Sequence, residues 1–262
     1  MSDDARSGDG GGEYRRPGRA PSFLAFHGFT GTTSELRPML DAVAAAGFAV
    51  EAPLLPGHGT TPSDLQNRTF DEWLSAGRAH RDRLLARGDS LVLCGFSMGS
   101  LVALALAAET TPRLRGLVVL GNAIELAIHS SLPFRLFDRF GWRVPDAYLK
   151  KPRRADMEDR EAAQLLTSYD RHPLRSAMEV YRAGLRVRPL VGKITCPTLI
   201  LHGAKDHVCS RKNAAWVADH VASRDVTVRV YERSAHVVAA DFDRDAVARD
   251  VVGFLQRLPV EP

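Results

Sequence analysis

The chain has 262 residues, 45% hydrophobic and 25% charged, an ordinary composition for a globular protein with a sizeable core. Its 35 basic and 31 acidic residues are interspersed, and the formal net charge is only +4, so nucleic acid is not an expected partner. The longest apolar run is far too short for a membrane span, and no apolar signal segment follows the N-terminus. We therefore expect a cytoplasmic protein without an integral membrane segment.

The cysteines are Cys94, Cys196 and Cys209, an odd number without a C-x-x-C motif. Two of them lie in or beside apolar strands, so we expect buried or incidental reduced thiols. No cluster of histidine and cysteine has metal-ligand spacing, and no metal is expected.

The first residues are rich in Asp, Gly, Ser and Arg, and we assign residues 1–20 to a disordered tail, although residues 13–18 would allow a short strand and a turn. Residues 23–26 are apolar and predict a buried strand, which ends in the glycine-punctuated loop 27–31. The next predicted elements are a helix over 35–46, a strand over 48–52 and a turn-rich loop over 53–59.

Thr69 and Glu72 have the spacing of a capping box, which predicts a helix that ends near Arg87 before Gly88. A short apolar strand and an Ala/Leu-rich helix follow it. The remaining predicted core elements are strands over 116–120, 198–202 and 226–231 and helices over 213–221 and 245–258. Several strands are apolar without alternation, which is typical of a parallel α/β sheet of six to seven strands covered by helices on both faces.

One segment, residues 123–193, lacks this alternation of strands and helices. It predicts short helices over 132–140, 157–169 and 175–185. A structureless loop of this length would count against the assignment, whereas a small helical cap would not. We therefore predict a cap over 123–193, inserted between two halves of one core domain, 21–122 and 194–262.

The chain is organised around residues 95–99, a G-x-S-x-G motif centred on Ser97. The motif alone is a weak signal, and a serine-containing loop is the alternative. Here an apolar strand over 91–94 precedes it and a buried helix over 101–108 follows it, which is the context that a nucleophile elbow requires. Gly95 and Gly99 allow strand and helix to close on the turn, and the helix N-terminus favours negative charge.

A serine hydroxyl needs a base within hydrogen-bond reach. His236 follows the last predicted strand and is the candidate base, and Asp206 follows the strand over 198–202 and is the candidate acid. The alternative for Asp206 is a helix cap, with Asp225 and Asp241 as reserve acids. His27 is expected to shape its loop, and His202 lies at a strand end.

The oxyanion hole of such a site takes one main-chain N–H from the residue after the nucleophile and one from the loop after the first parallel strand. These residues are Met98 and Phe29. Because the donors are main-chain groups, the two side chains should affect the shape of the pocket more than its charge.

The motifs HGFTGT (27–32), LPGHGTTPSDL (55–65), GFSMGS (95–100), HGAKDHV (202–208) and SAHVV (234–238) together resemble those of α/β-hydrolases, in particular bacterial monoacylglycerol lipases and carboxylesterases. The resemblance implies an α/β-hydrolase fold, a hydrolysed carboxylic ester as small-molecule substrate, a cap that lines the acyl site, and no cofactor. Ser100 departs from the second glycine common in the group, which bears on local packing.

The first functional hypothesis is a serine hydrolase that cleaves monoacylglycerols or short- to medium-chain esters through an acyl-enzyme. The alternatives are a thioesterase, amidase or C–C hydrolase with the same triad, and a non-catalytic binding protein of this fold. The ordered serine, acid and histidine favour an enzyme. In the cap, Phe134, Phe137 and Phe140 are candidate walls of the acyl pocket, although packing on the core is the simpler account for most such side chains.

Overall fold

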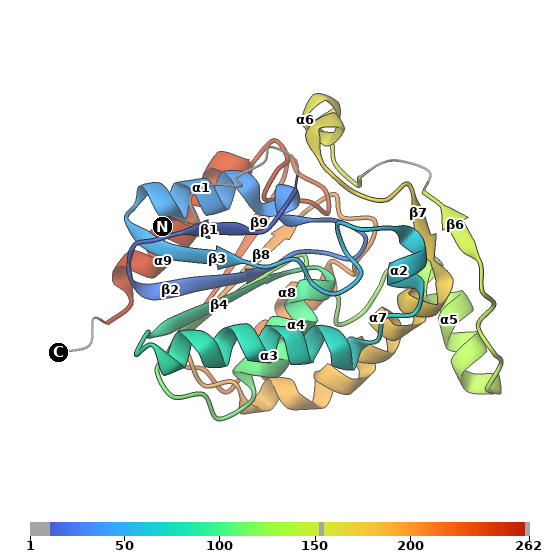
Figure 1. Ribbon diagram of the computed structural model, residues 1–262, viewed down its shortest axis with the longest axis horizontal. Helices are drawn as coiled ribbons and strands as arrows, with labels where there is room; N and C mark the ends of the chain where they lie inside the picture. Colours follow the sequence, from blue (N-terminus) through green and yellow to red (C-terminus); the bar gives the residue numbers. More distant parts are fainter. Residues whose placement is uncertain (1–10, 152–154, 260–262) are drawn as a thin grey trace, which may run out of the picture.

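The structure, a computed structural model, describes residues 11–151 and 155–259. Within them, seven strands form one sheet, which confirms the mostly parallel sheet of six to seven strands (Figure 1). Only the edge strand β1 runs antiparallel to its neighbour β3. Across the sheet the strands are β1 (Tyr14–Arg16), β3 (Phe48–Ala52), β2 (Arg19–Phe26), β4 (Leu91–Phe96), β5 (Leu114–Leu120), β8 (Thr198–Gly203) and β9 (Val226–Tyr231).

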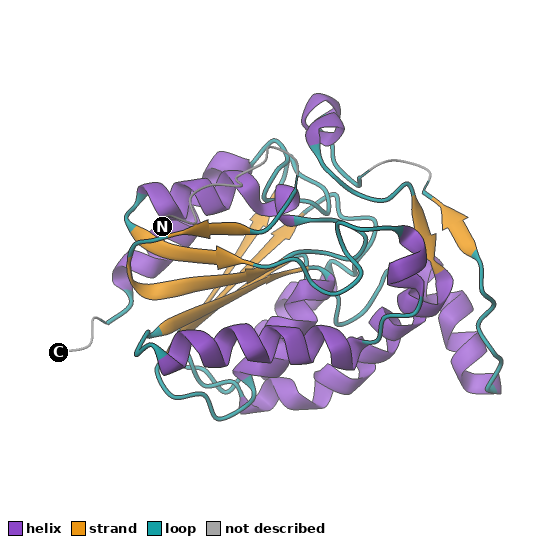
Figure 2. Cartoon of the chain, in the orientation of Figure 1, coloured by secondary structure: helices purple, strands orange, loops and turns teal. Residues whose placement is uncertain are grey.

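Helices cover both faces of the sheet, which makes a three-layer molecule (Figure 2). Helices α1 (Arg37–Ala45) and α9 (Arg244–Arg257) pack together on one face. The other face carries α3 (Phe70–Ala86), α4 (Met98–Ala107), α7 (Leu174–Val187) and α8 (Lys212–His220). Each face has its own cluster of buried apolar side chains, so the strands between them are buried on both sides.

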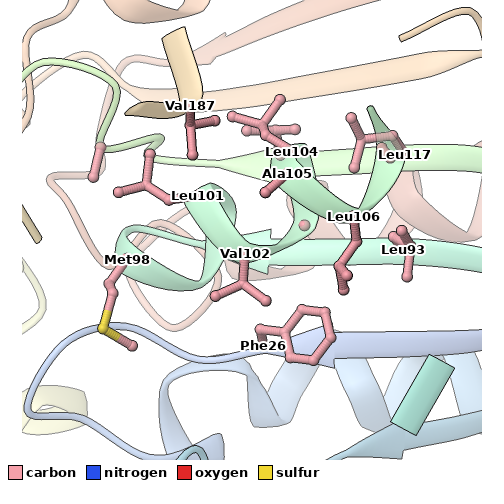
Figure 3. Close-up of a cluster of buried hydrophobic side chains, with 14 of the residues drawn as sticks. Phe26, Leu93, Met98, Leu101, Val102, Leu104, Ala105, Leu106, Leu117 and Val187 are labelled. Atoms are coloured by element: carbon pink, nitrogen blue, oxygen red, sulfur yellow. The ribbon is translucent and has the colours of Figure 1, made fainter. Parts of the chain in front are cut away.

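Helix α4 is the central helix of the second face, and all of its residues are buried. Its Ala- and Leu-rich sequence gives it high helix propensity and an apolar surface all round. Figure 3 shows its side chains between Phe26 of β2, Leu93 of β4, Leu117 of β5 and Val187 of α7. The N-terminus of this helix is therefore fixed against the strands that precede the candidate site.

Two glycines allow this close approach of α4 to the strands. A Cβ atom on Gly95 would lie 2.2 Å from the Gly99 oxygen, and one on Gly99 would lie 2.3 Å from the Phe26 oxygen. Both obstacles are backbone atoms, which cannot move aside as a flexible side chain can. We expect Gly95→Ala to lower the free energy of unfolding by roughly 2–4 kcal/mol, measured by urea denaturation.

The matched control for this substitution is Gly253→Ala in helix α9, where an added Cβ would meet no atom within 4 Å. Alanine has the higher helix propensity, so this variant should gain about 0.5–1 kcal/mol. Equal urea midpoints for wild type and Gly95→Ala would contradict the close approach described here.

The inserted segment departs from the predicted helical cap in two ways. Its described part contains α5 (Ile128–Phe140), the short α6 (Arg160–Leu165) and an antiparallel hairpin of β6 (Tyr148–Lys150) and β7 (Arg171–Pro173), and α6 lies in the connection between these two strands. Helix α7, counted with the cap from sequence, packs on α4 and α3 as part of the core layer. The helix predicted over 157–169 is also too long, because α6 covers only Arg160–Leu165.

The N-terminal tail also ends earlier than predicted. Residues 14–16 form the edge strand β1, and β2 already begins at Arg19, so the tail assigned to 1–20 is wrong for these residues. The predicted disorder of residues 1–10 lies outside the described residues. Of the helices in the part of the chain that is described, none is long and apolar enough to cross a membrane. The three cysteines are free thiols, as predicted.

Candidate active site

Ser97 lies at the turn between β4 and α4, with φ 53° and ψ −119°. A positive φ is rare for a residue with a Cβ, and here it turns the chain from strand to helix within one residue. The Ser97 N–H donates to the Leu120 oxygen of the neighbouring strand at 3.0 Å. The hydroxyl of Ser100 donates to the Ser97 carbonyl and accepts the Ala123 N–H, which fixes the turn from the other side.

The three residues singled out from sequence as a catalytic set lie in one line of hydrogen bonds. His236 Nε2 is 2.9 Å from the Ser97 hydroxyl oxygen, and His236 Nδ1 is 2.8 Å from Asp206 Oδ2. All three residues are buried, with Ser97 8% exposed. They follow the carboxyl ends of β4, β8 and β9, and these ends lie on the same side of the parallel sheet.

Asp206 is held by its backbone surroundings as well as by His236. Its Oδ1 accepts the N–H groups of Val208 and Cys209 at 2.8 and 2.9 Å, and the imidazole Nε2 of His202 lies 3.2 Å from Oδ2. Burial alone would raise the pKa of Asp206, but His236, together with His202, lowers it far below its ordinary value. The carboxylate therefore stays ionised beside the imidazole.

The reserve acids have other positions. Asp241 is fully buried and accepts the N–H groups of Ala235, Glu158 and Asp159, so it organises the backbone before His236 without touching the imidazole. Asp225 is exposed. Asp206 is thus the carboxylate that the fold places on His236.

The pKa of His236 follows from the same contacts. Burial lowers it, but the charge and hydrogen bond of Asp206 outweigh burial, and the pKa is raised above its ordinary value of 6.5. A base must be neutral to accept a proton, so we expect kcat/KM for an ester to fall as the pH drops through a value above 6.5. Initial rates at low substrate concentration between pH 5 and 9 would measure this limb, and a midpoint below 6 would contradict the raised pKa.

The candidate oxyanion donors lie on either side of the elbow. Met98 is the first residue of α4, where helix geometry leaves the N–H groups without intrahelical acceptors. Phe29 follows the end of β2, which the start of α4 touches at Gly99. Among the described residues, neither N–H is engaged in a hydrogen bond.

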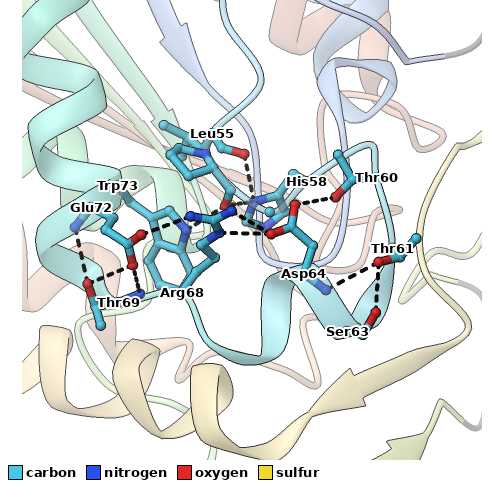
Figure 4. Close-up of polar contacts among 12 residues, drawn as sticks. Leu55, His58, Thr60, Thr61, Ser63, Asp64, Arg68, Thr69, Glu72 and Trp73 are labelled. Atoms are coloured by element: carbon cyan, nitrogen blue, oxygen red, sulfur yellow. Dashed lines mark hydrogen bonds and ion pairs between the residues drawn. The ribbon is translucent and has the colours of Figure 1, made fainter.

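The loop that carries Phe29 rests on the loop after β3. The Leu55 N–H donates to His27 Nε2 at 3.0 Å, and His27 Nδ1 lies 2.9 Å from the Gly28 oxygen. Burial lowers the pKa of His27 to about 4, so the ring is neutral and shapes its loop, as the sequence suggested. Trp73 of helix α3 donates to the Pro56 oxygen of the loop after β3, and Arg68 bridges Asp64 and Glu72 (Figure 4).

The inserted segment directly contacts the loop that carries Phe29. The imidazole of His172, in β7, stacks on the Phe29 ring with centroids 5.9 Å apart. The Tyr169 N–H donates to the Thr30 oxygen at 2.9 Å, and the Tyr169 hydroxyl donates to Gly57. The hairpin therefore lies over the loop that carries one of the candidate oxyanion donors.

The three phenylalanines proposed from sequence as acyl-pocket walls contact other aromatic rings. Phe134 stacks on Tyr181 of helix α7, and Phe137 and Phe140 both contact Trp142 in the inserted segment. Phe140 is 57% exposed, and none of these ring contacts involves a triad residue. A cleft of about 510 Å³ lies between Trp142, Met178 and the segment 66–69, and the triad does not line it.

The described residues contain one group with metal-ligand proximity, namely Asp206, Cys209 and His236, whose ligand atoms lie within 4.8 Å of one another. Two of these three already bond to each other, and burial raises the pKa of the Cys209 thiol well above its ordinary value. A thiol that stays protonated is a poor metal ligand. The arrangement therefore suits proton transfer better than metal binding.

Three side chains at this site have roles that the sequence pattern did not predict in full. Ser100, expected to affect local packing, fixes the elbow, and Asp241, considered as a reserve acid, fixes the backbone before His236. Glu35 accepts the N–H of Gly28 beside the candidate oxyanion donor Phe29. The pattern in sequence had indicated only that Glu35 begins a helix, and nothing local shows that its side chain turns back toward the loop.

The sheet order, the elbow and the Ser97–His236–Asp206 line together define an α/β-hydrolase. A family model described as "Serine aminopeptidase, S33" matches residues 20–243, and the chain belongs to this family of hydrolases. The resemblance stated from the motifs is thus confirmed.

Characterised relatives cover nearly the whole chain. A thermostable monoacylglycerol lipase of Bacillus sp. (strain H-257) is 27% identical over 89% of this chain and 90% of its own length. A carboxylesterase of Bacillus subtilis (strain 168) is 26% identical over 90% of this chain and 92% of its own length. Lipase and esterase relatives of this extent support ester hydrolysis in general.

Solved structures show the same fold. The metagenome-derived lipolytic enzymes LipS and LipT are represented by a structure with a TM-score of 0.85, 24% identity, and coverage of 95% of this chain and 98% of that chain. The monoacylglycerol lipase of Paleococcus ferrophilus matches with a TM-score of 0.79, 20% identity, and coverage of 93% and 98%. The α/β-hydrolase fold predicted from sequence is confirmed.

Proposed function

We propose that this hydrolase cleaves carboxylic esters of short- to medium-chain acids, including monoacylglycerols, through an acyl-enzyme at Ser97. The observation that carries the proposal is the continuous line from Asp206 Oδ2 through the His236 ring to the Ser97 hydroxyl, with distances of 2.8 and 2.9 Å. No cofactor is required for this chemistry.

In the first half-reaction the Ser97 oxygen attacks the ester carbonyl carbon, and its proton passes to His236 Nε2. The carbonyl oxygen becomes negative and accepts hydrogen bonds from the N–H groups of Phe29 and Met98. The ionised Asp206 stabilises the imidazolium. When the carbon–oxygen bond to the alcohol breaks, His236 returns the proton to the departing alcohol oxygen.

In the second half-reaction a water molecule gives a proton to His236 Nε2 and attacks the acyl carbon. The second tetrahedral intermediate collapses, the proton returns to the Ser97 oxygen, and the carboxylic acid leaves. Each half-reaction uses the same base and the same two N–H donors.

The substrate class is proposed from two supports. The relatives include a monoacylglycerol lipase and a carboxylesterase of similar length. The inserted segment lies over the Phe29 loop, where it would bound the space for an acyl chain. Phe134, Phe137 and Phe140 remain our candidates for apolar walls.

The test is a substrate panel of p-nitrophenyl esters of graded chain length, monoacylglycerols, thioesters and aminoacyl amides. We expect kcat/KM for esters to exceed that for amides at least tenfold. The amides matter because the family model carries the description of an aminopeptidase. Preferred cleavage of amides or thioesters would replace ester hydrolysis as the function, and no turnover of any of them would favour a binding protein.

The length of the acyl chain of the substrate should also affect kcat/KM. Each methylene moved from water into an apolar pocket gains about 0.8 kcal/mol, so kcat/KM should rise roughly three- to fourfold per carbon and level off at medium length. Phe137→Ala should flatten this rise, whereas Val230→Ala, on the exposed edge strand β9, should not. A flat series in wild type, or highest activity on emulsified triacylglycerol, would reject a capped medium-chain esterase.

A further inference from the structure

We propose that Glu35 is a positioning residue of the oxyanion hole, whose carboxylate holds the loop from Gly28 to Gly31 so that the Phe29 N–H faces the Ser97 site. The inference rests on the function proposed above, because an oxyanion hole matters only where Ser97 attacks a carbonyl carbon. Glu35 takes no part in the proton transfers of that mechanism.

Glu35 belongs to the short helix η1 (Thr33–Leu36) and is only 7% exposed. Its Oε2 accepts the N–H of Gly28 at 3.0 Å. Gly28 immediately precedes Phe29, so this hydrogen bond fixes the peptide next to the proposed donor. A carboxylate acceptor makes the stronger, charge-assisted kind of hydrogen bond.

The loop is also wound around the carboxylate. A Cβ on Gly31 would lie 2.1 Å from Glu35 Oε1, and a Cβ on Gly28 would lie 3.0 Å from Oε2. Thr30 has φ 63°, and the Gly31 N–H donates to the Gly28 oxygen at 3.3 Å, which closes a tight turn. Removing the carboxylate would leave an empty space inside this turn, next to Phe29, whose N–H is the proposed donor.

Charged groups from two other elements face Glu35. Burial raises the pKa of Glu35 to about 7, although Lys151 of the cap, the Gly28 N–H and His236 each lower it. In turn Glu35 is one of the groups that raise the pKa of His236. An ionised Glu35 therefore favours the imidazolium, and its replacement by a neutral side chain should move the acid limb of kcat/KM to lower pH.

The experiment compares Glu35→Ala with Glu35→Gln. The glutamine keeps the shape and a carbonyl acceptor for the Gly28 N–H but removes the charge. We expect Glu35→Ala to lower kcat roughly 10- to 100-fold with KM changed less than about threefold, since a misplaced donor costs transition-state stabilisation. Glu35→Gln should restore kcat to within about fivefold of wild type and shift the acid limb downward.

The matched control is Glu51→Gln on β3. Glu51 is 5% exposed and pairs with His80, Arg83 and Arg15, away from the triad. This variant also removes a buried carboxylate charge, and it should lower stability without moving the acid limb or kcat per folded molecule. Equal losses in Glu35→Ala and Glu35→Gln, or a loss in Glu35→Ala no larger than that of Glu51→Gln, would overturn the positioning role.

A second readout does not depend on activity. In wild type the amide shift of Gly28, followed by NMR, should titrate with a midpoint near the Glu35 pKa of about 7, and this titration should be absent in Glu35→Gln. A Gly28 amide that titrates equally in both proteins would overturn the contact. Labelling of wild-type Ser97 by a fluorophosphonate separately reports the proposed function, so if labelling fails, the Gly28 titration alone decides the place of Glu35.

Discussion

Ser97→Ala should lower kcat/KM for esters roughly 10⁴- to 10⁶-fold while the protein remains folded. The hydroxyl oxygen of Ser97 lies 2.9 Å from His236 Nε2, and no other described side chain has a hydroxyl bonded to this imidazole. Alanine and serine both carry a Cβ and meet the same strain at φ 53°. The substitution therefore removes the proposed nucleophile without changing the backbone of the elbow.

Two measurements check this expectation. Steady-state hydrolysis of a p-nitrophenyl ester gives the loss, and labelling by a fluorophosphonate with peptide mapping locates the nucleophile. Ser75→Ala, the same chemical change on the exposed surface of α3, should keep wild-type activity and labelling. If Ser97→Ala is still labelled or still turns over at a tenth of the wild-type rate, Ser97 is not the nucleophile.

The sequence predicted best where local pattern and tertiary structure agree. The elbow required an apolar strand, a serine between glycines and a buried helix, and all three are local features that the structure contains. The Thr69–Glu72 capping box also needed only residues three apart, and both of its hydrogen bonds are present. Such elements can be predicted from sequence because their local preferences agree with the fold.

Other parts of the fold depend on contacts between distant residues. Strands β6 and β7 have three residues each, too few to show an alternating pattern, and they pair across the 20 intervening residues 151–170. β1 is equally short and is defined by its pairing with β3. Helix α7 showed its helical period, but only its packing on α4 places it with the core rather than with the cap.

The residues of the candidate site also divide into those that the sequence pattern predicts and those that only the tertiary structure reveals. The motifs indicated Ser97, Asp206 and His236, because their places after strands follow from chain order in this fold. Glu35 and His202 lie beside candidate site residues through side-chain directions that no motif encodes. Their polar atoms are buried next to Phe29 and Asp206, and a burial pattern of this kind becomes visible only in three dimensions.

Asp206→Asn should lower kcat/KM roughly 10³- to 10⁴-fold. The asparagine oxygen can still accept the N–H groups of Val208 and Cys209, so its amide NH₂ faces His236 Nδ1. Nδ1 must then accept a hydrogen bond, and the proton of the neutral ring moves to Nε2. In that tautomer Nε2 donates to Ser97 and cannot take its proton. The base is therefore present but in the wrong form.

Stability gives an independent readout of the same substitution. The pKa of Asp206 is lowered in the folded protein, so its ionised form contributes stability that is present above the unfolded pKa of about 3.9 and is lost as the pH falls through the folded pKa. Wild type should therefore lose stability to urea below about pH 4 more steeply than Asp206→Asn does.

Asp225→Asn provides the control, because Asp225 is exposed and directly precedes β9, whereas His236 follows the other end of that strand. It should keep wild-type kcat/KM at every pH. An Asp206→Asn variant with a rate within tenfold of wild type would show that Asp206 does not set the tautomer of His236. In that case Asp241, which holds the Ala235 N–H next to His236, would be the carboxylate to replace next.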